Sequence, residues 1–271
     1  MRLHVIHRTE YRFTHPQKRL IQLLRLTPGN HAGQSVISWR IDVDRDARFK
    51  PSRDGYGNDT TMLYVDGPLD RIAITVSGEV LTEDRAGMVD GTVEPLPPLF
   101  YLQSTPATRA DAAITAFVAS LGLPEERLPG AHRLAETLHE RLVLTDADAQ
   151  ADDSAVARFT AGSADARGAA HLLIAAARAA GYPARYVAGH LYRPYQAEAH
   201  AAHGWAEIHV DGYGWIGFDA YEGCCPTAGY VRVAVGLDHG QAAPISGARI
   251  GGGGEMLAID VHVGPEPAPQ D

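Results

Sequence analysis

The chain has 271 residues, 45% hydrophobic and 7% aromatic, which is enough to build the core of one large domain or two medium ones. Its formal net charge of −9 and isoelectric point near 5.8 argue against nucleic acid or an anionic membrane as the main partner. No apolar run is long enough to cross a bilayer, and the two adjacent cysteines, Cys224 and Cys225, exclude a disulfide framework.

The N-terminal third of the chain has the pattern of an all-β domain. Its first residues alternate like a strand and lack the apolar segment and cleavage site of a signal peptide, so we expect a cytoplasmic protein. Further short strand patterns, parted by Gly, Pro, Asn and Asp turns, predict an antiparallel β-sandwich over residues 1–86. The turn at residues 54–58 is expected to be a hairpin rather than a ligand-binding loop.

A second, helix-containing domain is expected over residues 101–264, after a Gly- and Pro-containing linker at residues 87–100. Helical patterns at residues 108–122 and 128–143 are followed by an acidic surface loop. Ser154 then has the position of an N-cap before a short helical turn. Strand patterns recur near the C-terminus, and residues 265–271 are expected to be a disordered tail.

The most informative stretch runs from residue 162 to residue 219. Residues 166–180 are small or aliphatic around nearly the whole circumference, which is typical of a helix buried inside a domain. Gly181 and Pro183 are suited to end that helix. Three strands are then predicted, at residues 184–189, 205–210 and 215–219.

Three linked motifs in this stretch point to a known family. "GYPARYVAG", "HGWAE" and "GWIGFDA" occur in this order and with tight spacing. The chain therefore resembles the bacterial transglutaminase-like family, whose core is shared with papain-like cysteine proteases. The resemblance implies an α+β fold: an N-terminal antiparallel β-sandwich domain, then a core with a central helix packed on an antiparallel sheet.

The resemblance also implies a catalytic site, but one that lacks its nucleophile. Such a site combines a cysteine at a helix N-terminus, a histidine that takes its proton and a carboxylate that orients the histidine. In this sequence the cysteine position falls on Ala166, the histidine on His203 and the carboxylate on Asp219. A methyl group cannot attack a carbonyl. Small residues also replace larger ones just after Ala166, which favours a natural pseudoenzyme over an engineered inactive mutant.

The neighbouring polar and aromatic residues allow more than one interpretation. Ser163 and Asp165 are expected to serve as turn or capping residues, and Cys224 and Cys225 as small buried thiols rather than displaced nucleophiles. His203 and Asp219 with His171 or His200 match no named zinc motif, so neither a metal nor a cofactor is predicted. Five residues are predicted to line the cleft, with core packing as the alternative for the two tryptophans: Arg185, Trp205, Trp215, Tyr221 and His171.

Two functions remain open from the sequence. The first is a non-catalytic module whose cleft binds a peptide or protein partner. The second is a cysteine protease, amidase or acyl transferase of the same family that is inactive through the alanine at position 166 or uses a displaced nucleophile. The sequence specifies neither a substrate nor an oligomeric state.

Overall fold

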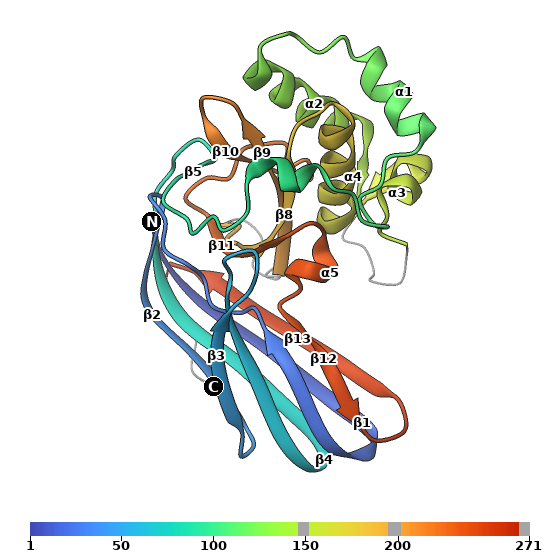
Figure 1. Ribbon diagram of the computed structural model, residues 1–271. Coiled ribbons are helices and arrows are strands. Elements are labelled where there is room, and N and C mark those ends of the chain that lie inside the picture. The colour runs from blue at the N-terminus through green and yellow to red at the C-terminus, as the bar shows by residue number, and fades with distance from the viewer. Residues whose placement is uncertain (146–151, 195–201, 266–271) are drawn as a thin grey trace.

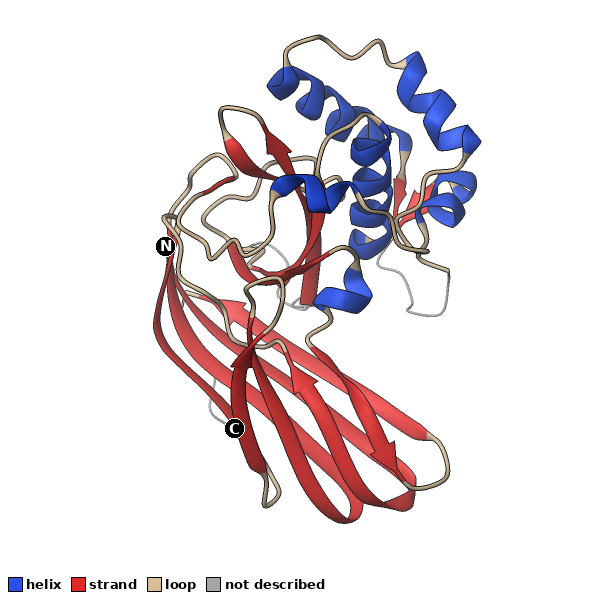
Figure 2. Ribbon diagram, in the orientation of Figure 1, coloured by secondary structure: helices blue, strands red, loops and turns tan. Residues whose placement is uncertain are grey.

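The computed structural model describes residues 1–145, 152–194 and 202–265, and shows a long β-sheet beside a helix-bearing unit (Figure 1). The N-terminal unit consists of strands and their connections, whereas the helices of the described ranges lie in the other unit (Figure 2). The fold is α+β, with an all-β N-terminal unit, as the sequence predicts. In the described part of the chain, no helix is long and apolar enough to cross a membrane.

Two long antiparallel strands form the centre of the N-terminal sheet. β1 (Arg2–Leu24) pairs along its length with β4 (Asp59–Thr82). β2 (Gln34–Val43) pairs with the later half of β4, and β3 (Arg48–Arg53) with the earlier half. The register of β1 on β4 shifts between Arg12 and Arg19, so β1 continues through a stretch that contains Pro16.

The sheet curls so that its two halves share one hydrophobic cluster. That cluster combines Leu20 and Leu63 from one half with Ile72 and Val76 from the other, and Trp39 of β2 packs against it. Since alternate residues of a strand point to opposite faces, each strand contributes every second side chain to this core.

The two C-terminal strands belong to the N-terminal sheet, which corrects the predicted domain boundary. β12 (Ile245–Ile250) and β13 (Glu255–Gly264) both pair with β1, on the side opposite β4. Val261 and Val263 are buried there with Leu3 and Val5 of β1. Residues 245–264 therefore complete the first sheet and are not part of the second unit, although the sequence assigns them there.

The second unit is built on a five-stranded antiparallel sheet in the order β11-β8-β9-β10-β5. Its strands are β5 (Met88–Val89), β8 (Ala184–Leu191), β9 (Ala202–Val210), β10 (Gly214–Phe218) and β11 (Tyr230–Gly236). Its helices are η1 (Pro98–Leu102), α1 (Ala112–Ser120), α2 (Arg127–Arg141), α3 (Ala155–Ala161), α4 (Ala166–Ala179) and α5 (His239–Ala242). β6 (Val143–Leu144) and β7 (Ser163–Ala164) form a short parallel pair.

The central helix is α4, as predicted from its apolar circumference. Its residues from Gly168 to Ala177 are all buried, in one cluster with side chains of β8 and β9. Ser154 caps α3 as expected, with its hydroxyl accepting the Ala157 N–H at 3.3 Å. α1 begins later than its sequence pattern, because Asp111 caps it through the Ile114 N–H.

The segment predicted as a linker is instead packed into the second unit. Met88 and Val89 pair with β10, and Leu96 and Phe100 pack on a buried cluster around Tyr101 and Trp215. Composition alone misses this, because each of these apolar residues finds its partner far away in the sequence. The acidic loop lies largely outside the described residues, as does the expected tail after residue 265.

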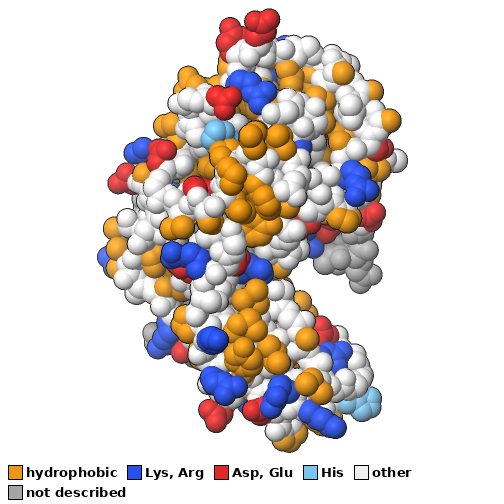
Figure 3. All heavy atoms as spheres, viewed as in Figure 1, with side chains coloured by type: hydrophobic (Ala, Val, Ile, Leu, Met, Phe, Trp, Pro, Cys, Tyr) orange, Lys and Arg blue, Asp and Glu red, His pale blue; other side chains and the backbone are white. Residues whose placement is uncertain are grey.

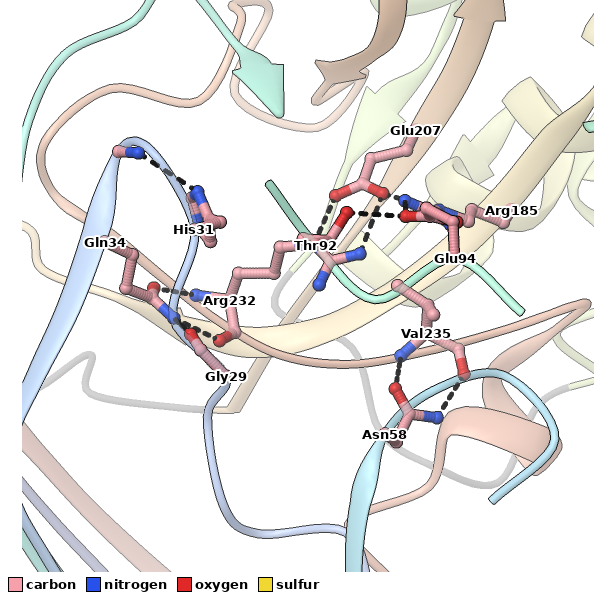
Figure 4. A network of polar contacts seen from close by, with 11 residues as sticks. Gly29, His31, Gln34, Asn58, Thr92, Glu94, Arg185, Glu207, Arg232 and Val235 are labelled. Atoms are coloured by element: carbon pink, nitrogen blue, oxygen red, sulfur yellow. Dashed lines mark hydrogen bonds and ion pairs between the residues drawn. The ribbon is translucent and has the colours of Figure 1, made fainter. Parts of the chain in front are cut away.

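Two amide side chains of the N-terminal unit join the two sheets at β11, the edge strand of the second one (Figure 4). Gln34 donates to the Arg232 carbonyl and accepts its N–H, both at 2.8 Å. Asn58 does the same for Val235, again at 2.8 Å. The turn at residues 54–58 therefore serves as a contact between the two units.

Candidate functional site

The N-terminus of α4 is well ordered by its own cap. Asp165 accepts the Gly168 N–H at 2.8 Å, which satisfies one of the free amides of the first turn. This is the capping role expected for Asp165. Ala166 follows as the first helical residue and is partly exposed, at the end where the helix dipole favours negative charge.

His203 and Asp219 lie in contact, on β9 and directly after β10. The His203 Nε2 atom is 2.5 Å from Asp219 Oδ2, and both side chains are almost fully buried. β9 and β10 are neighbours with Phe218 opposite Ala206, so the sheet register itself brings the two residues together.

Asp219 is held by four hydrogen bonds from different directions. Besides His203, the Tyr230 hydroxyl donates to Oδ2 at 2.9 Å, and the Tyr221 and Glu222 N–H groups donate to Oδ1 at 2.9 and 3.1 Å. Burial alone would raise the pKa of this carboxyl. The charge and hydrogen bond of His203, together with the Glu222 and Tyr230 hydrogen bonds, outweigh burial and lower the pKa.

The hydrogen bond to Asp219 determines how His203 can act. An ionised carboxylate only accepts, so Nε2 carries a proton. The other ring nitrogen, Nδ1, makes no hydrogen bond to any described residue. His203 can therefore accept or hold a proton at Nδ1 while Asp219 fixes its orientation, which is the arrangement of a general base.

Aromatic rings surround the imidazole. The ring centroid of His203 lies 6.2 Å from Trp205 and from Tyr221, and 5.9 Å from Tyr230. Of the residues predicted to line a cleft, Trp205 and Tyr221 are thus beside His203. Trp205 is only 2% exposed, so its ring also has a packing role.

Arg185 and Trp215 lie in the protein interior. Arg185 is fully buried, bonded to Glu207 at 2.6 Å and to Glu94 at 2.7 and 2.9 Å (Figure 4). Its guanidinium carbon lies 3.9 Å from the Trp215 ring centroid. A buried cation needs such partners, and its strand position supplies them, so the prediction that Arg185 and Trp215 line a cleft is wrong.

His171 also has an internal role. Its Nδ1 lies 2.9 Å from the Asp153 carbonyl, and its Nε2 accepts the His239 N–H at 3.0 Å. The ring ties α4 to α5 and is 3% exposed, so it does not line a cleft either. Because both nitrogens are used within the fold, His171 has none left for a ligand.

The alternative nucleophiles are poorly suited to attack. Cys224 is exposed and Cys225 half-buried, so they are not the pair of small buried thiols that the sequence predicts. Cys224 Sγ lies 3.4 Å from the Tyr230 hydroxyl, and partial burial raises the pKa of this thiol. Partial burial also raises the pKa of Cys225, to about 11. The thiolate is the reactive form, so both thiols are weak nucleophiles at neutral pH. Ser163 lies in β7, opposite Val143.

The described residues contain no group of three or more His, Cys, Asp or Glu side chains placed to hold a metal ion. His200, one of the ligands considered from the sequence, lies outside the described residues.

Two residues of the site have no signal in the sequence. Tyr230 donates to Asp219 from β11, and His139 of α2 lies 3.0 Å through Nδ1 from the Ala220 carbonyl. The His139 ring also fills the space beside Gly223, where a Cβ would come within 2.6 Å of it. Both contacts depend on tertiary packing, so no local motif marks them.

Comparison with known proteins agrees with this geometry. Residues 3–81 match the bacterial transglutaminase-like N-terminal region, and residues 115–220 match the transglutaminase-like superfamily core. The second match contains Ala166, His203 and Asp219. The chain belongs to the transglutaminase-like family.

The relatives of this transglutaminase-like chain extend over nearly its whole length. It is 25% identical over 281 residues to an uncharacterised protein of Mycobacterium leprae, covering 97% of this chain and 98% of that one. It is 27% identical over 289 residues to one of Mycobacterium tuberculosis, covering 97% and 91%. A solved structure from Cytophaga hutchinsonii, provisionally described as a cysteine protease, has a TM-score of 0.78 at 17% identity, covering 100% and 92%. That structure has the same fold.

Proposed function

We propose that this transglutaminase-like chain is a pseudoenzyme that binds a peptide or protein segment beside His203 and performs no acyl transfer. One observation carries the proposal: the His203–Asp219 pair is fully formed at 2.5 Å, while the position that the family resemblance gives to the nucleophile holds Ala166. A site that keeps its histidine–carboxylate pair but has no nucleophilic sulfur can bind a peptide segment but cannot form a covalent acyl intermediate.

The surroundings of the pair suit a peptide. Among the described residues, none makes a hydrogen bond to His203 Nδ1, so this nitrogen can accept one from a donor of the bound segment, such as a backbone or side-chain amide. The Tyr221 ring offers an apolar contact beside it. On the face seen in Figure 3, acidic and basic side chains are interspersed, so this face favours no strongly charged polymer.

Reduced casein, a chain rich in peptide bonds and glutamine side chains, tests both halves of the proposal. The purified protein should neither cleave casein nor attach an amine to its glutamines above the level of a His203→Ala variant, because no nucleophile is present. Casein peptides should shift the His203 ring resonances in NMR spectra. His203-dependent turnover would contradict the pseudoenzyme, and unshifted His203 resonances would contradict the peptide site.

The second candidate is an enzyme with a displaced nucleophile. The contact of Cys224 with Tyr230, which itself bonds Asp219, is the observation that favours it. The raised pKa of this thiol weighs against it. If casein turnover is seen and Cys224→Ser abolishes it while Cys225→Ser does not, this second candidate replaces the first.

A further inference from the structure

A small cavity lies where the N-terminal unit meets the second sheet. Its volume is about 40 Å³, room for about three water molecules. Segments from both units form its wall, including residues 31–34 and 83–89 together with parts of β9, β10 and β11. Its principal polar or aromatic side chains are His31, Arg85, Trp205, Thr227, Tyr230 and Arg232.

The wall includes the indole N–H group of Trp205. Trp205 is 2% exposed, and its indole Nε1–H makes no hydrogen bond to any described residue. The Nε1 atom lies beside Gly217, another wall residue, where a Cβ would be only 3.5 Å away. This N–H group can therefore donate to a molecule bound in the cavity.

A second unpartnered donor lies in the same wall. His31 Nδ1 accepts the Gly33 N–H at 3.2 Å, so the proton of the neutral ring is on Nε2 (Figure 4). That Nε2 is buried and has no partner in the described structure. Burial lowers the pKa of His31 to about 4, which keeps the ring neutral at physiological pH.

The charged groups of the wall are mainly cationic. Arg232 is neutralised by Glu207, at 2.7 and 3.2 Å. Arg85 has a weaker partner, because Asp90 lies 3.7 Å away and both side chains are substantially exposed. Glu83, the carboxylate of the wall, is exposed to solvent. The cavity therefore offers more free donors than acceptors.

We propose that this cavity binds a small carboxylate, with the Trp205 indole N–H and the Arg85 guanidinium as its donors. A carboxylate has only acceptor atoms, so it can accept hydrogen bonds from both of these donors. An acetate-sized anion suits the volume of the cavity. The inference does not depend on the loss of the nucleophile.

Binding of a carboxylate in this cavity should affect the surroundings of His203. Trp205 lies between the cavity and the His203–Asp219 pair, with ring centroids 6.2 Å from His203 and 5.3 Å from Tyr230. Tyr230, also in the wall, donates to Asp219. A bound carboxylate thus contacts two residues that touch the pair.

Sodium acetate, titrated into ¹⁵N-labelled full-length protein at constant ionic strength, tests the proposal. The Trp205 indole N–H signal, assigned with Trp205→Phe, should shift saturably. The Trp39 indole signal should not move, because its N–H already donates to the Leu26 carbonyl at 2.8 Å. Arg85→Gln should weaken acetate binding about tenfold, whereas Arg19→Gln, which alters a surface ion pair with Asp66, should leave it unchanged.

The proposal is overturned if the Trp205 signal does not saturate, if chloride at equal ionic strength causes the same shift, or if both arginine variants bind acetate like the parent. A parallel titration with N-acetyl-glutamate amide separates two sources of the carboxylate. Binding of acetate alone assigns the cavity to a free small acid, and binding of both assigns it to an acidic side chain as well.

Discussion

At the scale of single residues, Asp219 is the best-supported group of the site. Its two oxygens accept four hydrogen bonds, and its backbone also closes the following turn through the Cys224 and Gly223 amides. A buried carboxylate is stable only with such support. The sequence motif identifies Asp219, but the partner that completes its shell, Tyr230, comes from a different strand.

Replacing Tyr230 with phenylalanine should therefore destabilise the protein. The change removes a 2.9 Å hydrogen bond to a buried carboxylate, and bonds to charged groups contribute about 1.5–3 kcal/mol. The free energy of unfolding in urea should fall by that amount. Tyr213→Phe, at a tyrosine that is 53% exposed, is the matched control and should change it by less than about 0.5 kcal/mol. Equal effects of the two variants would show that the Tyr230 hydroxyl does not support Asp219.

At the scale of elements, β11 is the strand on which the two units meet. β8 covers one edge of it, and the side-chain amides of Gln34 and Asn58 cover the other. Each amide bonds both backbone groups of one β11 residue, as a neighbouring strand would. Two side chains of the N-terminal unit thus make the hydrogen bonds that a neighbouring strand would make at the free edge of β11.

Asn58→Ala should uncouple the units at this edge. It leaves the Val235 N–H and carbonyl without partners in a buried place, and each such group costs about 1–3 kcal/mol. The free energy of unfolding in urea should fall by about 2–6 kcal/mol. Asn30→Ala, which removes one hydrogen bond at an exposed position, should cost under about 1.5 kcal/mol. A loss for Asn58→Ala no larger than that of the control would contradict the role of Asn58.

The elements also show what the sequence could and could not predict. The burial of α4 was predictable because small and aliphatic residues occupy nearly all of its faces. The capping role of Asp165 was predictable because a helix cap is a local feature of the sequence. The positions of β12 and β13 in the first sheet were not predictable, because their partner β1 lies at the opposite end of the sequence. Arg185 was misplaced for the same reason: its partner Glu94 lies 91 residues away, in an apparent linker.

At the scale of the whole molecule, the two sheets share a buried interface. Val231, Val233 and Ala234 of β11 join one hydrophobic cluster with valines of the N-terminal sheet. Within this interface, the rings of His7 and His190 pack edge to face, with centroids 5.4 Å apart. Both are almost fully buried, and the Nδ1 atom of each has no partner in the described structure.

Acidification should weaken the fold through this pair. Burial lowers the pKa of His7 to about 4, although Asp260 opposes it, and burial with the charge of His7 lowers that of His190 to about 3. Both lie below the ordinary value of 6.5, so the unfolded chain binds more protons. The stability that the neutral pair contributes is complete above pH 6.5 and is lost as pH falls from 6.5 towards 4 for His7 and towards 3 for His190.

Urea unfolding between about pH 7 and pH 5 measures this effect. Once the pH is well below 6.5, each neutral histidine adds a slope of about 1.4 kcal/mol per pH unit. His7→Phe should remove about that much of the slope, whereas His15→Phe, at an exposed position, should leave the slope as it is. An unchanged slope in His7→Phe would mean that other groups carry the pH dependence.

We propose that this transglutaminase-like chain keeps its His203–Asp219 pair although position 166 carries no thiol. The most direct test of this proposal is Ala166→Cys in a background where Cys224 and Cys225 are replaced by serine. We expect position 166, at the helix N-terminus, to face His203, and both features would favour the thiolate. At neutral pH the new thiol should therefore react with iodoacetamide at least about tenfold faster than a cysteine introduced at exposed Ser35. His203→Ala should remove that advantage. If the Ala166→Cys thiol reacts no faster than the Ser35→Cys control, or reacts equally fast after His203→Ala, position 166 and His203 do not form the site that we propose.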